Sequence, residues 1–177
     1  MASKRDALLS MLESNTNHPS LSTLVAAVEE EQPADLNLDA ELLSGVWDLR
    51  WSSSSQPWLR QAPWLENLQI LDPAQQRGCN LLRLRGPLGT IGAISVQADL
   101  KLIDSQRVEV RFRQGGWLGP RIPGIGQIKL LREVQQSFPA WLDITVLDRD
   151  LRICRGNAGT TFVLSRRDAI SAQQFLN

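Results

Sequence analysis

The sequence predicts an all-β fold: an antiparallel sheet of about eight or nine short strands, closed as a barrel or packed as a sandwich, behind a helical N-terminal segment. Residues 107–113 alternate charged and apolar side chains at every position, which is typical of an antiparallel strand with one buried and one wet face. Residues 141–164 read as three short strands joined by two tight turns, at 148–150 and 156–159. No long helical pattern separates the strands, which argues against a doubly wound α/β fold.

Residues 1–40 are expected to form a helical appendage. Residues 3–14 carry apolar side chains at helical spacing, with Ser3 and Asp6 as a capping pair. A second helix should begin at Ser20 or Ser22 and end before Pro33. The chain then divides into a barrel over 41–166 and a tail or short helix over 167–177.

Strand candidates follow at regular intervals. In 45–51, Trp47, Leu49 and Trp51 share the inward face, and Gly45 allows a tight entry into a closed sheet. Further strands are expected at 67–72, 78–85, 91–100, 107–113 and 128–131. The inward residues expected in two of these strands are Ile94, Val96, Ala98, Leu100, Val108, Val110 and Phe112.

Two apolar loops interrupt the pattern. Residues 52–66 contain Pro-Trp-Leu twice, with Trp58 and Trp64, and residues 115–126 are rich in Gly and Pro, with Trp117, Ile122 and Ile125. If both loops lie at one end of the sheet, they line a ligand mouth or rest in a membrane interface, where Trp is favoured. The alternative is that they fold back and cap the barrel, because tryptophans in a small domain also serve packing.

Composition and residue usage argue against several functions. Lys plus Arg equals Asp plus Glu at 19 each, so no long-range field favours nucleic acid. Cys79 and Cys154 lack metal-ligand spacing and read as free thiols. The single histidine, His18, stands beside Pro19 between helices, where we expect a surface position. We therefore expect no catalytic residue, metal or cofactor.

Two further motifs have ordinary explanations. Asp143, Asp148 and Asp150 would suit a hard cation, but the favoured explanation is an exposed strand position for Asp143 and two turn aspartates. Asp148 and Asp150 would then bond turn amides or pair with Arg152 and Arg155. The glycines at 86, 89 and 92 and at 124 and 126 open no helix and lack a P-loop lysine. No signal peptide, transit segment or membrane span is visible, so we expect a cytoplasmic protein, or one peripheral on a membrane.

Residues 43–51 and 142–164 carry a family likeness. Leu-Ser-Gly-Val-Trp-Asp-Leu-Arg-Trp and the long closing block around Arg-Gly-Asn-Ala-Gly-Thr-Thr-Phe-Val-Leu resemble the plastid lipid-associated proteins, also called plastid fibrillins. The likeness covers residues 5–166. Val146 stands where the family usually has Tyr. Without a transit peptide, the chain is more similar to a cyanobacterial member.

The resemblance implies a lipocalin-like barrel, association with thylakoid membranes or lipid globules, and binding of an apolar molecule such as a carotenoid, quinone or fatty acid. It also implies a role in photoprotection or stress. Gly45-x-Trp47 is similar to the first-strand motif of lipocalins, in which a late-strand Arg covers the Trp; Arg152 or Arg155 would fill that structural role. Such a contact is worth about 0.5–2 kcal/mol.

The favoured hypothesis is a non-enzymatic binder of an apolar ligand or lipid surface. The expected cavity or mouth residues are Trp47, Trp51, Trp58, Trp64, Ile94, Val96, Phe112, Trp117, Ile122 and Ile144. An enzyme of lipid or pigment metabolism is the alternative, with Asn80 and Gln97 as interior polar groups. A protein-interaction module would instead use the outer face of 107–113.

Overall fold

The computed structural model describes residues 3–59, 62–138 and 140–176, without the side chains of Trp58 and Gln174, and confirms the mainly-β prediction. Nine strands form one antiparallel sheet in this part of the chain. The strands are β1 (Gly45–Ser52), β2 (Leu65–Asp72), β3 (Arg77–Leu84), β4 (Ala93–Leu102), β5 (Arg107–Ile122), β6 (Gly126–Glu133), β7 (Ala140–Leu147), β8 (Leu151–Gly156) and β9 (Thr161–Arg166). The helices are α1 (Lys4–Ser14), α2 (Leu21–Glu31), α3 (Leu36–Asp39) and the short 3-10 helices η1 (Ala40–Leu43), η2 (Pro57–Leu59), η3 (Gly86–Thr90) and η4 (Ala172–Gln174).

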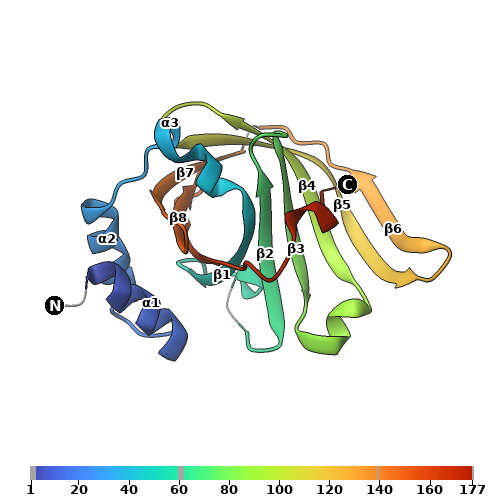
Figure 1. The fold of residues 1–177 in the computed structure, drawn as a ribbon, viewed down its shortest axis with the longest axis horizontal. Helices are drawn as coiled ribbons and strands as arrows, with labels where there is room; N and C mark the ends of the chain where they lie inside the picture. Colours follow the sequence, from blue (N-terminus) through green and yellow to red (C-terminus); the bar gives the residue numbers. More distant parts are fainter. Residues whose placement is uncertain (1–2, 60–61, 139, 177) are drawn as a thin grey trace.

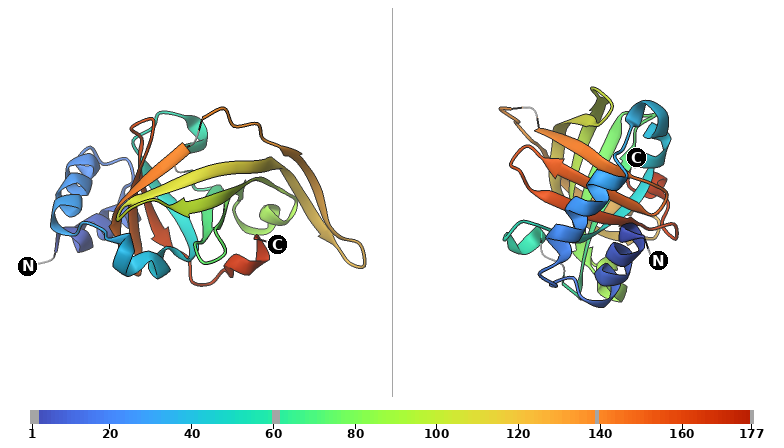
Figure 2. Two further views of the ribbon diagram at one scale, coloured as in Figure 1. Left: turned by 90° about the horizontal axis from the view of Figure 1, so that it is seen from above. Right: turned by 90° about the vertical axis from the view of Figure 1, so that its left-hand side faces the viewer.

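The sheet closes on itself. The strand order is β4-β3-β2-β1-β9-β8-β7-β5-β6, and an additional pairing of β4 with β5 closes the sheet, leaving β6 outside. We call the closed set β1–β5 and β7–β9 the ring (Figure 1). Strand β6 lies outside the ring and pairs with the far half of β5. We call this hairpin, residues 114–133, the ribbon; it projects away from the ring (Figure 2).

The ribbon corrects the prediction of a loop at 115–126, because β5 continues through this segment to Ile122. Glycine makes the continuation feasible. Gly116 has φ +155°, and a Cβ there would lie 2.1 Å from the carbonyl oxygen of Leu130 on β6. A Cβ on Gly92 or Gly119 would fall within 2.5 Å of the Trp117 indole. These glycines therefore leave room for the neighbouring strand and for one large side chain.

A side chain bridges the point where β5 changes partner. β5 pairs with β7 only over 107–110 and with β6 from Gln114 onward. Between these stretches, Gln136 accepts a hydrogen bond from the Phe112 N–H at 2.7 Å and donates one to the Val110 carbonyl at 3.3 Å. Its amide thus stands in for a strand backbone.

Helices α1 and α2 pack on the outer face of β7, β8 and β9. Their buried apolar residues form one cluster with strand residues that face away from the ring interior. The cluster contains Leu8, Leu12, Leu21, Val25, Val28, Val146, Leu151, Ile153 and Val163. Arg5 bonds Asp148 at 2.6 Å, and Arg155 pairs with Glu29, so ion pairs border the contact.

The ring has one plugged end. α3 and η1 bring Leu36 and Leu43 into the inner cluster of apolar side chains, together with Trp47, Leu100 and Ile144. On the opposite, outer face of β1–β3, a third cluster lies under the C-terminal segment, which contributes Ile170 and Phe175. Residues that point into the ring thus alternate along each strand with residues that point to the covered outer face, as the period of two requires.

Candidate ligand-binding face

Arg166 covers Trp47 at the plugged end of the ring. Its guanidinium carbon lies 4.3 Å from the centroid of the indole. The guanidinium donates to the carbonyl oxygens of Ser44 (2.6 Å), Leu42 and Arg149, while the Trp47 indole N–H donates to Leu43. A Cβ on Gly45 would lie 2.5 Å from the Arg166 Nη1, so a side chain at this position would displace the guanidinium. This arrangement fixes η1 across the end of the ring.

Of the two arginines proposed for this role, Arg152 also lies over the Trp47 ring, whereas Arg155 does not. Arg155 is exposed on the outer face, where it binds Glu29 rather than Trp47. Arg152 points into the ring with no exposed surface, and its guanidinium carbon lies 5.1 Å from the Trp47 ring. Arg166 was missed, although it follows the inward Leu164 by two residues and so shares its face.

The plugged half of the interior is filled by side chains. Ile144, expected to line a cavity, is 1% exposed and packed. The void that it lines has a volume of only about 10 Å³. Its walls are Leu43, Leu71, Pro73, Leu100, Leu102, Val108, Leu142 and Ile144. A space of this size holds one water molecule at most, so this void does not hold a ligand.

The other half of the inner face is apolar and open. Along β4, buried Leu100 and Ala98 give way to half-buried Val96 and then to Ile94, which is 55% exposed. The register pairs Ala98 with Phe112 and Ile94 with Trp117, so these residues share one face.

The open inner face continues onto both neighbours. Leu82 and Leu84 lie on it in β3, and Trp117 pairs with Leu130 in the ribbon. Trp117 is 38% exposed and Leu130 66%. We call the whole set the open inner face; it consists of Leu82, Leu84, Ile94, Val96, Phe112, Trp117 and Leu130.

The remaining predicted residues are dispersed. Trp51 was expected inside, but a bulge between Leu49 and Trp51 turns its side chain toward the helices, where it packs on the outer cluster. Trp64 is largely exposed, whereas Leu59 from the same loop packs against the inner cluster.

Ile122, also predicted, sits outside the open inner face. Ile122 is partly exposed at the end of β5, beside the ribbon tip. The Trp58 side chain lies outside the described residues.

The polar residues proposed for an enzyme do not converge inside the ring. Gln97 lies on the outer face, where its Oε1 accepts from Gln114 at 2.6 Å, and Asn80 lies on the inner face but is exposed. The buried carboxylates among the described residues, Asp48 and Glu66, face outward. Arg167 bonds both of them, at 3.1 and 3.3 Å. Burial raises the pKa of Asp48 despite the opposing charge of Arg167.

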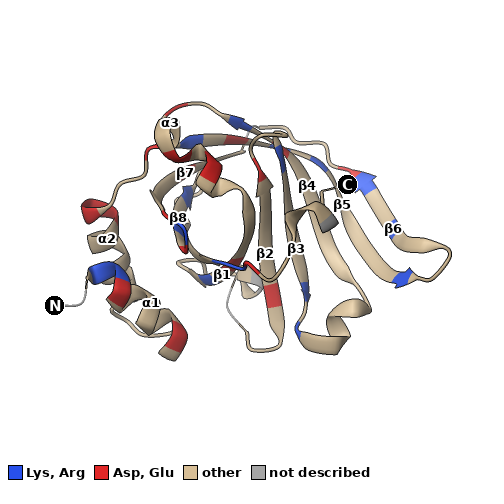
Figure 3. Ribbon diagram, in the orientation of Figure 1, with Lys and Arg blue, Asp and Glu red and all other residues tan. Residues whose placement is uncertain are grey.

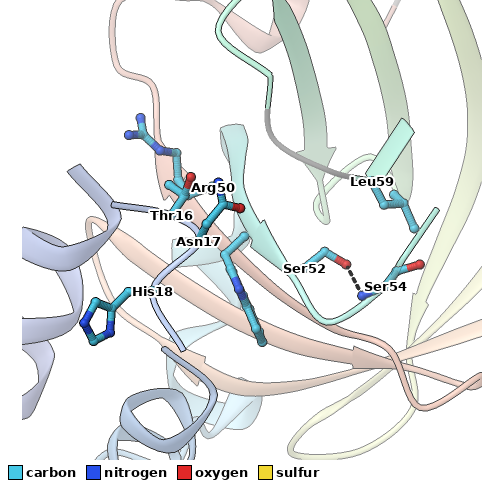
Figure 4. A pocket seen from close by; sticks show the side chains of 8 residues that line it. Thr16, Asn17, His18, Arg50, Ser52, Ser54 and Leu59 are labelled. Atoms are coloured by element: carbon cyan, nitrogen blue, oxygen red, sulfur yellow. Dashed lines mark hydrogen bonds between the residues drawn. The ribbon is translucent and has the colours of Figure 1, made fainter. Parts of the chain in front are cut away.

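His18 lies in a surface hollow of about 360 Å³ between the α1–α2 connection and the end of β1. Figure 4 shows His18 on the helical side and Ser52 and Ser54 on the strand side. The His18 Nδ1 accepts the Ser20 N–H at 3.2 Å, and Ser52 accepts the Ser54 N–H at 3.1 Å. Among the described residues, none that lines the hollow carries a carboxylate. A nucleophilic triad is therefore not assembled there.

The charged residues of the outer face are engaged in pairs. Arg107 binds Asp143 through two bonds of 2.7 and 2.8 Å and lies 4.2 Å over Trp141. Arg111 and Arg113 pair with Glu109 and Asp99. In the described part of the chain, no group of three or more His, Cys, Asp or Glu is arranged to hold a metal ion.

This geometry defines a class: a small antiparallel β protein, plugged at one end, whose interior opens at the other end onto an apolar face. The PAP_fibrillin family model matches residues 10–165, and the chain belongs to this family. None of the described helices is long and apolar enough to cross a bilayer.

Relatives of the chain carry names that refer to plastid lipids. It is 27% identical over 150 residues to "Probable plastid-lipid-associated protein 12, chloroplastic" of Arabidopsis thaliana, which covers 78% of this chain and 36% of the relative. It is 29% identical over 200 residues to "Plastid lipid-associated protein 1, chloroplastic" of Brassica campestris, covering 86% and 61%. The chain thus spans about one third to three fifths of these relatives. No solved structure matches it.

Proposed function

We propose that the chain binds an apolar small molecule or lipid on the open inner face, without catalysing a reaction on it. One observation carries the proposal: large apolar side chains on β3, β4, β5 and β6 adjoin on one face and stay exposed, next to a packed interior. Contiguous exposed apolar surface of this kind marks a binding site. The lipid-associated names of the relatives support the same function.

The ribbon is the proposed contact with a lipid surface. Its tip carries Ile122 and Ile125, and Ile125 is 79% exposed. Exposed basic residues, among them Arg121 and Arg132, lie near the tip and along the ribbon (Figure 3). An apolar tip between cations suits the interface of a bilayer that contains anionic lipids. In a cyanobacterial-type member this surface would be a thylakoid membrane or lipid globule, with a role in photoprotection or stress.

Binding is tested with the purified protein. Organic-solvent extracts are analysed by mass spectrometry for co-purified lipids or pigments, and hexadecanol is titrated against a bound uncharged fluorophore. Ile94→Ser should weaken hexadecanol binding about five- to thirtyfold, because an apolar side chain of the site contributes about 1–2 kcal/mol. Leu38→Ser is the matched control, since Leu38 is exposed on α3 at the plugged end.

Membrane contact is tested by flotation with vesicles of phosphatidylcholine and phosphatidylglycerol. The native chain should float, Ile125→Ser should float less, and Leu38→Ser should behave as the native chain. A clean extract, no hexadecanol binding and no flotation would together refute the proposed function.

A further inference from the structure

We propose that the ring binds the anionic head of an amphiphile, and that Arg152 is the residue that pairs with this head. The inference rests on the proposed function, because the tail would occupy the open inner face. It adds the chemical class of the ligand: a long apolar chain that ends in a carboxylate or phosphate.

Arg152 is a buried cation with incomplete hydrogen bonding. The side chain is fully buried, its Nη2 donates to the Gln69 Oε1, and its Nε and Nη1 have no acceptor. A guanidinium removed from water without a counter-ion is strongly unfavourable. Its free donors therefore call for an anion.

Other arginines of the chain show the contrast. Arg5, Arg83 and Arg107 each bond a carboxylate within 2.8 Å on the outer face. Arg152 bonds no carboxylate: its partners are the Gln69 amide and the neighbouring Cys154 thiol. The nearest cation, Arg166, lies over the same Trp47 indole and bonds only carbonyl oxygens. Two guanidinium groups therefore adjoin one indole.

The neighbouring thiol does not neutralise this charge. Cys154 lies two residues from Arg152 on the same face and is fully buried. Burial raises the pKa of the Cys154 thiol, although the charge of Arg152 opposes the shift. The thiol is therefore uncharged near neutral pH. The buried carboxylates Asp48 and Glu66 face the other side of the sheet.

The open inner face leads to Arg152. Gln69, which accepts from Arg152, pairs across β2 and β3 with Asn80, and Asn80 is exposed and pairs with Val96. A head that enters beside Asn80 and replaces the Gln69 amide as acceptor would reach the guanidinium. Its tail would then lie along Val96, Ile94 and Trp117. Charge-assisted bonds to Arg are the common means of holding carboxylate and phosphate.

The test compares ligands with one tail and three heads. Palmitate, hexadecyl phosphate and hexadecanol compete with diphenylhexatriene for the full chain. At least one anion should bind about 10- to 100-fold more tightly than the alcohol, and the better anion identifies the head. Arg152→Met should abolish this preference but leave hexadecanol binding within about threefold. Arg155→Met, on the outer face of the same strand, should preserve the preference.

A second measurement needs no variant and decides the question if Arg152→Met fails to fold. Palmitate labelled with carbon-13 at the carboxyl, or hexadecyl phosphate observed through phosphorus-31, is followed by NMR while the pH is lowered. A head on Arg152 should stay ionised below the pH at which the free head protonates, about 4 to 5 for a carboxylate.

The outcomes separate the two proposals. Equal binding of the acids and the alcohol, or a bound head that titrates like the free one, would overturn the role of Arg152 and leave the apolar site intact. No binding of any of the three ligands would overturn both.

Discussion

Arg166→Met tests whether one guanidinium holds the plugged end of the ring together. The native side chain makes hydrogen bonds to three backbone carbonyls, those of Leu42, Ser44 and Arg149, and stacks on Trp47. Each bond contributes about 0.5–1.5 kcal/mol net, and the indole contact about 0.5–2 kcal/mol. Because the guanidinium is only partly buried, we take the lower part of the range and expect a loss of about 2–4 kcal/mol. For a chain of this size, Tm should fall by about 5–15 °C.

The assay is urea unfolding followed by circular dichroism, with Arg111→Met as control. Arg111 is exposed and makes one ion pair, with Glu109 at 3.7 Å, so its loss should cost less than about 0.5 kcal/mol. Arg166→Lys should recover only part of the loss, because an ammonium cannot reach three carbonyls in fixed directions. The reasoning fails if Arg166→Met unfolds within about 0.5 kcal/mol of Arg111→Met.

Two further predictions concern the ribbon and the helical segment. Gly116→Ala should separate β5 from β6, because its Cβ would lie 2.1 Å from the Leu130 carbonyl oxygen. Gly115→Ala is the control: its Cβ meets only ordinary contacts of 3.5 Å, so the change should be near neutral. Hydrogen exchange of the β6 amides measures the pairing, and equal protection in both variants would contradict the prediction. Acid should loosen α1 and α2 from the ring. Burial alone would raise the pKa of Glu29, but hydrogen bonds from Arg155 and Thr145 outweigh burial and lower this pKa. Burial would also raise the pKa of Asp148, and the hydrogen bond from Arg5 lowers it. Because each carboxyl has a lower pKa in the folded chain than in the unfolded chain, its ionised form stabilises the fold at pH values above the unfolded pKa. This contribution is lost as the pH falls through the folded pKa. Between about pH 7 and pH 3, Glu29→Gln should lose less unfolding free energy than the native chain, while Glu13→Gln, an exposed change on α1, should lose as much; equal losses in all three would count against the idea.

Simple alternation predicted much of the sheet. The apolar residues expected to point inward from β4, among them Ala98 and Leu100, do so because this strand contains no extra residue and the period of two holds. Gln97, expected as an interior polar group, lies on the outer face for the same reason. The plugged interior follows from the same pattern, since Leu100, Val108 and Ile144 all point inward.

A bulge and a glycine-rich strand explain the positions at which the alternating pattern gave a wrong prediction. One extra residue between Leu49 and Trp51 reverses the direction of Trp51, and a bulge has no reliable signature in sequence. Residues 115–122 contain Gly and Pro and looked like a loop, but the space required by Trp117 and the pairing with β6 make them strand. Arg166 was overlooked because a charged residue beyond the last apolar position of a strand gives no sign in the sequence that it covers Trp47.

The bridging amide of Gln136 has a consequence for how the ring comes apart. In the described chain, β5 and β7 are joined by four residue pairs, as are β1 and β2, against eight between β2 and β3. Beyond Val110, β5 bonds the side chain of Gln136, in the connection between β6 and β7, rather than a ladder of β7. The β5–β7 contact is therefore a short interface that can separate while other strands stay paired, and it runs toward the open end. The interior should widen first at the β5–β7 interface when a bulky ligand binds.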